Sequence, residues 1–179
     1  MENLEDILKL DPNAKTKQFK RGEIIQRKGQ EKAHSYFVLS GLLRSYIIDQ
    51  KGKEHIFAFA PEAWIIADVE SLEFHEPVEL YISCLEDTEV VIFDRDCLFR
   101  ADVSKETITQ NFKLLYRRMG VLQRRIIMQM SAPAQDRYLY FLQTYPQLLN
   151  RIPQHMIASY LGITPQALST IRARMSKTK

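Results

Sequence analysis

Cysteine and histidine are scarce in this chain of 179 residues, which holds two of the former and four of the latter. Cys84 and Cys97 lack the spacing of a metal site and cannot supply four thiolates to an iron–sulfur cluster. The histidines are scattered, which argues against a metal or haem site: His34, His55, His75 and His155. We therefore expect no metal, no cofactor, and two buried thiols in a reducing cytoplasm.

Long apolar runs and catalytic signatures are also missing. No stretch of eighteen apolar residues is present, and the acidic, amphipathic start does not resemble a signal peptide, so we expect a cytoplasmic protein with no membrane partner. The sequence has no glycine-rich phosphate loop, no Gly-x-Ser-x-Gly elbow and no His-Glu-x-x-His motif. The acidic run at 68–79 could hold a hard metal ion, but such runs are more often solvated loops. An enzyme is not expected.

Charge is unevenly divided along the chain. The total of 25 basic and 22 acidic residues gives only +3. Residues 1–100 hold 13 basic and 19 acidic residues, a net of −6, while residues 101–179 hold 12 and 3, a net of +9. A basic C-terminal half is the charge distribution expected for binding a polyanion, although a solvated basic face is the alternative.

The region from Gln18 to about Phe93 has the pattern of short strands separated by turns. Turn signals such as Ser40-Gly41 and Asp49-Gln-Lys-Gly52 interrupt the apolar segments. Expected strands include residues 23–26, 36–39, 42–48, 55–59, 80–83 and 89–93. Strands at this interval predict an antiparallel sandwich or barrel. Short helices are expected at residues 1–10 and from Asp94.

A long helix is expected over residues 104–130. Its apolar residues follow spacings of 4, 3, 4, 3 and 4, which form a heptad seam: Ile108, Phe112, Leu115, Met119, Leu122 and Ile126. The seam could pack on the core of the same chain, but we expect a helix this long to pair with its copy in a second subunit. The sequence thus predicts a homodimer. Ser131 is expected to cap the helix that follows.

Residues 152–175 predict a helix-turn-helix. Ile157 and Leu161 share one face of the first helix, and Gly162 suits a left-handed C-terminal cap. Thr164 and Pro165 suit the N-cap and first residue of the second helix. Leu168, Ile171 and Met175 form the buried stripe of that helix.

The opposite face of the second helix is uncharged and is flanked by basic residues. It carries Gln166, Ser169, Thr170 and Ala173, edged by Arg172, Arg174 and Lys177. Such a face suits a helix in the major groove of double-stranded DNA. An ordinary pair of packed helices is the alternative.

This order of parts resembles the Crp/Fnr (cyclic-AMP receptor protein) superfamily of bacterial transcription regulators. The resemblance covers nearly the whole chain and is carried by residues 19–25 (FKRGEII), 36–41 (YFVLSG), 86–90 (EDTEV) and 152–175. Residues 132–138 (APAQDRY) with 157–165 (IASYLGITP) resemble the regulators of Bacteroidetes-type bacteria. The resemblance implies an α+β architecture: a β-roll (jelly-roll) sensor at 1–103, a dimerisation helix at 104–130 and a DNA-binding domain at 131–179.

The sensor departs from the phosphate cassette of cyclic-AMP-binding relatives. The resemblance places Ala67-Asp68-Val69 where relatives have Gly-Glu-Leu, and Val78-Glu79-Leu80 where they have Arg-Ser-Ala. Val78 thus stands where an arginine would neutralise the phosphate, and no lysine or arginine lies between residues 54 and 94. We predict an effector pocket that binds neither cyclic AMP nor cyclic GMP, and that is empty or takes another ligand, apolar or cationic.

The recognition helix departs from relatives as well, since Pro165, Gln166 and Thr170 stand where many carry arginine or glutamate. Gln166 could pair with adenine, and the methyl groups of Thr170 and Ala173 could contact thymine. The resulting hypothesis is a homodimeric, sequence-specific regulator of transcription, with RNA polymerase as a partner if it activates. The alternative is a ligand-binding module whose helix pair docks on a protein.

Overall fold

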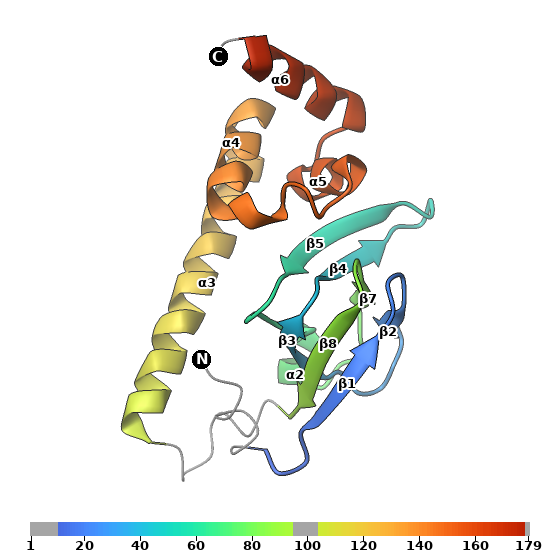
Figure 1. Cartoon of the computed structure of the whole chain (residues 1–179), viewed down its shortest axis with the longest axis vertical. Helices are drawn as coiled ribbons and strands as arrows, with labels where there is room; N and C mark the ends of the chain where they lie inside the picture. The colour runs from blue at the N-terminus through green and yellow to red at the C-terminus, as the bar shows by residue number, and fades with distance from the viewer. Residues whose placement is uncertain (1–10, 95–103, 178–179) are drawn as a thin grey trace. The chain divides into compact units, whose positions relative to one another are not determined.

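The computed structural model describes residues 11–94 and 104–177 (Figure 1). The chain divides into two compact units, Met1–Ile47 with Phe57–Leu115 and Ile48–Ile56 with Tyr116–Lys179. The helices expected at residues 1–10 and from Asp94, and the second cysteine, Cys97, lie outside the described residues apart from Asp94 itself.

Eight short strands make up the β part of the described chain, and each of the six segments expected as strands overlaps one of them. They are β1 (Lys15–Phe19), β2 (Ile24–Gln26), β3 (Ser35–Ser40), β4 (Leu43–Ile48), β5 (Glu54–Ala60), β6 (Ile65–Ile66), β7 (Tyr81–Cys84) and β8 (Thr88–Phe93). They form two four-stranded sheets, ordered β1-β8-β3-β6 and β2-β7-β4-β5. Each strand pair whose register is resolved is antiparallel, which confirms the predicted antiparallel jelly-roll-like fold.

The core of this part draws on both sheets. Phe19, Val38 and Val90 come from the first sheet, and Leu43 and Ile82 come from the second, all buried in one cluster. Because side chains alternate along a strand, the inward residues of both sheets fill one apolar layer, as in a sandwich.

The turn between β3 and β4 requires glycine. Gly41 has a φ of 91°, in the left-handed region that other residues adopt only with strain. A Cβ at this position would lie 2.5 Å from both the carbonyl oxygen of Asp87 and the hydroxyl oxygen of Thr88. The close approach of the two loops therefore excludes any side chain, which explains the Ser40-Gly41 turn.

The remaining elements are mostly helical. They are α2 (Val69–Phe74), α3 (Lys105–Ser131), α4 (Ala134–Thr144), the 3-10 turn η2 (Pro146–Leu148), α5 (Gln154–Leu161) and α6 (Pro165–Lys177). The long helix expected over 104–130 is confirmed as α3. The cap expected at Ser131 is wrong: its hydroxyl donates to the carbonyl of Ile127 within α3, and Pro133 precedes α4 instead. A serine bonded to the preceding turn continues a helix rather than starting one.

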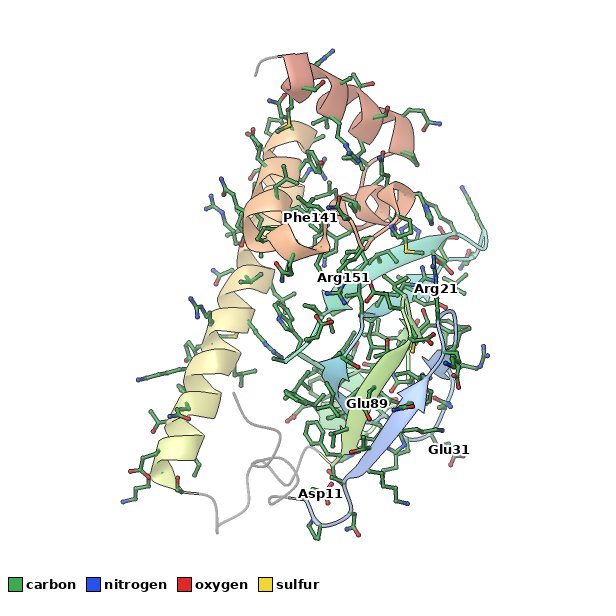
Figure 2. All side chains as sticks on the ribbon, viewed as in Figure 1. Asp11, Arg21, Glu31, Glu89, Phe141 and Arg151 are labelled. Carbon is green, nitrogen blue, oxygen red and sulfur yellow. The ribbon has the colours of Figure 1, made fainter. Side chains whose placement is uncertain are left out.

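Aromatic side chains form the centre of the helical unit. Phe141 of α4, labelled in Figure 2, lies with its ring 5.5 Å from those of Tyr145 and Tyr160. The rings of Tyr145 and Tyr160 meet edge to face at 6.1 Å. Such contacts add to the apolar burial that holds α4 and α5 together.

Candidate functional site

The second helix of the C-terminal pair begins as its sequence predicts. Gly162 closes α5 with φ 67° and ψ 36°, a left-handed cap. The hydroxyl oxygen of Thr164 then accepts the amide of Ala167 at 3.1 Å, and Pro165 is the first residue of α6. The cap and the proline together fix where α6 starts and hence which side chains its outer face presents.

A buried stripe orients α6. Leu168 is fully buried and Ile171 is 9% exposed, while Met175 is half-buried. Since α6 packs on both α4 and α5, this stripe turns the opposite face outward. The side chains exposed on the rest of the helix include six of the predicted DNA-contacting residues: Gln166, Ser169, Thr170, Arg172, Ala173 and Arg174. The seventh, Lys177, is the last residue of α6.

The hydroxyl of Thr170 is already used within α6. It donates to the carbonyl oxygen of Gln166, one turn earlier, at 3.0 Å. With its one donor engaged, the hydroxyl of Thr170 keeps only its acceptor lone pairs for a ligand, and the methyl group is available for apolar contact. Gln166 keeps a side-chain amide with both a donor and an acceptor, as bidentate recognition of a base requires.

Two arginines hold the C-terminal end of α5, a role that no sequence pattern indicated. Arg125 of α3 donates to the carbonyl of Tyr160 at 3.0 Å, and its guanidinium lies 3.8 Å from the centre of that ring. Arg137 of α4 donates to the carbonyl of Leu161 at 2.7 Å. Carbonyls at a helix end need such donors, so these contacts fix α5, and through the turn α6, on α3 and α4.

The heptad seam of α3 is exposed in the single chain. The exposed fractions are 47% for Ile108, 57% for Phe112, 58% for Leu115, 52% for Met119, 40% for Leu122 and 57% for Ile126. A row of large apolar side chains this exposed is more than a monomeric protein normally leaves in water. Pairing of this seam with a second subunit stays a prediction.

The two segments of the expected effector pocket do lie together. Asp68 is 2% exposed, and its carboxylate accepts the amides of Ser71, Glu79 and Leu80. Val78 is 1% exposed, whereas Val69 is 65% exposed on α2. Of the remaining positions, Ala67 and Leu80 are half-buried and Glu79 is exposed.

A cation does reach this acidic segment, contrary to what the local sequence suggested. The ammonium of Lys28 pairs with the Glu79 carboxylate at 2.5 Å. Lys28 belongs to a distant turn, so residues 54–94 alone could not have revealed it. Both side chains are about half exposed, and such a surface pair contributes little stability.

The one cysteine in the described part of the chain is a structural thiol. Cys84 is 2% exposed, and burial raises its pKa to about 11. A thiol with so high a pKa stays protonated at neutral pH and is a poor nucleophile or metal ligand.

Among residues 11–94 and 104–177, no group of three or more histidine, cysteine, aspartate or glutamate side chains is arranged to hold a metal ion. The described helices include none that is long and apolar enough to cross a membrane.

Residues 16–101 match the family model of the cyclic nucleotide-binding domain. No curated protein matches the chain in sequence. Among solved structures, FixK2 from Bradyrhizobium japonicum matches with 20% identity and a TM-score of 0.73, covering 92% of this chain and 85% of its own. A CooA mutant from Carboxydothermus hydrogenoformans also has 20% identity and a TM-score of 0.73, covering 99% and 82%.

A third structure, TTHA1359 from Thermus thermophilus, is described as a transcriptional regulator of the CRP/FNR family. It is 15% identical with a TM-score of 0.71, and the match covers 92% of this chain and 87% of that one. The chain therefore has the fold of Crp/Fnr regulators, an antiparallel β part of the cyclic nucleotide-binding type followed by helices.

Proposed function

We propose that this chain is a homodimeric, sequence-specific DNA-binding regulator of transcription of the Crp/Fnr type. The observation that carries the proposal is the outer face of α6. It is exposed, it is uncharged at Gln166, Ser169 and Thr170, and it is flanked by Arg172 and Arg174. Hydrogen-bonding side chains between cations are what base recognition with phosphate anchoring requires.

The expected base preference follows from the chemistry of that face. The amide of Gln166 pairs with adenine in the major groove, and the methyl groups of Thr170 and Ala173 contact thymine. The arginines, with Lys177, bind phosphates and add affinity without selecting sequence. We expect an operator richer in A·T pairs than those read by relatives with arginine or glutamate in this helix.

The dimer is proposed to form through the seam of α3. Two copies of this helix, each exposing six large apolar side chains, would cover them against each other in knobs-into-holes packing. A two-fold dimer presents two copies of α6, which then read two half-sites about one helical turn, roughly 34 Å, apart. The proposal includes no catalytic step, and RNA polymerase is a partner only if the protein activates transcription.

The test is the salt dependence of binding to selected DNA. A regulator that contacts phosphates through arginines loses affinity steeply as salt rises, because condensed counterions are released on binding. Fluorescence anisotropy with an operator selected from a random pool, and with a scrambled duplex as the control, measures both affinity and specificity. Equal affinity for the two duplexes would contradict sequence-specific binding. Absence of salt-dependent binding to either duplex would favour the alternative, in which the helix pair docks on another protein.

A further inference from the structure

The buried carboxylate of Asp68 accepts three backbone amides. One of its oxygens accepts the backbone amide of Ser71 at 3.3 Å. The other accepts two successive amides, those of Glu79 and Leu80, each at 2.8 Å. The side chain is 2% exposed, so water does not share these bonds.

Two successive backbone amides that converge on one oxygen form a concave anion site. Proteins use this arrangement to hold phosphate and carboxylate groups of ligands. Here the anion belongs to the chain itself. We propose that Asp68 is an internal anion that occupies the amide pair of Glu79 and Leu80 and closes this position of the β-roll to anionic ligands.

The loop that carries the two amides is fixed from both sides without a ligand. The Ser71 hydroxyl donates to the carbonyl of Glu76 at 2.6 Å. Val78, which is 1% exposed, donates its amide to the carbonyl of Gln30 at 2.9 Å and accepts the amide of Gly29 at 2.7 Å. A loop held by this many internal hydrogen bonds is already ordered before any ligand binds.

An incoming phosphate or carboxylate would have to displace Asp68 and leave that carboxylate buried without its donors, which is costly. The surface cation at this loop, Lys28, is paired with Glu79 and does not offset the negative charge inside. The anion site therefore acts as a fixed structural part, and the β-roll needs no anionic effector to order it. The statement that the β-roll needs no anionic effector rests on the proposed regulatory function. The occupancy of the amide pair by Asp68 does not depend on that function.

Amide hydrogen exchange on the wild-type chain tests the occupancy directly. The amides of Glu79 and Leu80 are expected to exchange at least about tenfold more slowly than those of an exposed loop, with no added ligand. Millimolar phosphate or cyclic AMP should leave both rates unchanged. Fast exchange that slows only when one of these anions is added would overturn the proposal, because the site would then be open.

Removal of the carboxylate provides the second test. Asp68→Ala should lower the melting temperature by roughly 5–10 °C, and formate, which restores the missing group, should recover part of this loss in a saturable way. The matched control is Glu70→Ala, which removes an exposed carboxylate from the same short helix. Neither the control nor the wild type should respond to formate.

Equal melting of Asp68→Ala and the control, or an equal formate response in all proteins, would contradict the proposal. Should Asp68→Ala fail to fold, Asp68→Asn serves in its place. It keeps the shape but loses the charge, so exchange at Glu79 and Leu80 should accelerate. None of these measurements involves DNA, so their failure would leave the proposed DNA-binding function standing.

Discussion

Replacement of two seam residues by aspartate should separate the dimer. Leu115 and Leu122 lie one heptad apart on α3, and in the single chain they are 58% and 40% exposed. Neither side chain contributes much to the fold of its own chain, so Leu115→Asp/Leu122→Asp should leave each protomer folded. The same positions would be buried in the proposed dimer, and there the aspartates would be desolvated without a partner.

The size of the effect follows from these exposed fractions. Full burial of a leucine side chain contributes about 1.5–3 kcal/mol, so covering half of it contributes roughly 1 kcal/mol. Four leucines in a dimer thus contribute about 4 kcal/mol, and the buried carboxylates add several more to the cost. We expect the dimer Kd to rise at least about a thousandfold, since each 1.4 kcal/mol is tenfold.

Sedimentation velocity measures the change, with circular dichroism to show that the helices remain. Gln110→Asp/Gln123→Asp is the matched control, because it adds the same charge to exposed positions of α3 off the seam. The control should sediment as a dimer at micromolar concentration and the seam variant as a monomer. A folded dimer of the seam variant would refute the assignment of this interface.

Two further predictions concern stability. Thr164→Ala removes the N-cap of α6 and should lower the free energy of unfolding of the C-terminal unit by about 1 kcal/mol in urea titrations; Thr164→Ser keeps the cap, and equal losses in both variants would argue against it. Burial raises the pKa of Cys84 to about 11 and of Tyr36 to about 12. Because both pKa values are raised in the folded state, the stability that these two buried neutral groups contribute is fully present below about pH 9. It is lost as the pH rises through 11–12, so the free energy of unfolding measured in urea should fall over that interval. Tyr36→Phe should make this decrease in stability with pH less steep, and an unchanged slope would show that the Tyr36 phenol does not titrate between about pH 9 and 12.

Local chemistry explains why parts of the fold were predictable. Gly162, Thr164 and Pro165 act through their own backbone conformation and nearest amides, so their roles follow from three residues of sequence. The seam of α3 is equally local, because its period is that of the helix. These features set the position of the proposed DNA-contacting face.

Elements fixed by distant partners could not be predicted. β1 is polar over most of its length and is a strand because it pairs with β8, which lies far along the chain. β6 has only two residues. α2 lies in an acidic run, and the helix starts where it does because Asp68, its N-cap, accepts the amide of Ser71. Asp68 meets Glu79 and Leu80 eleven and twelve residues further on. Arg125 donates to the carbonyl of Tyr160, which lies 35 residues further on. In each case the partner lies far away in the sequence and is brought close by the tertiary structure, so a local sequence pattern cannot predict it.

The most direct test of the central claim is a binding-site selection with the wild type, Gln166→Ala and Arg174→Ala. The wild type should select two A·T-rich half-sites about one helical turn apart. Gln166→Ala should lose about 1–3 kcal/mol of discrimination at one base pair per half-site. Arg174→Ala should keep the sequence preference, weaken binding to every duplex, and flatten the salt slope by about one unit per lost contact. Selection of no sequence by the wild type, or a preference unchanged in Gln166→Ala but altered in Arg174→Ala, would contradict the account.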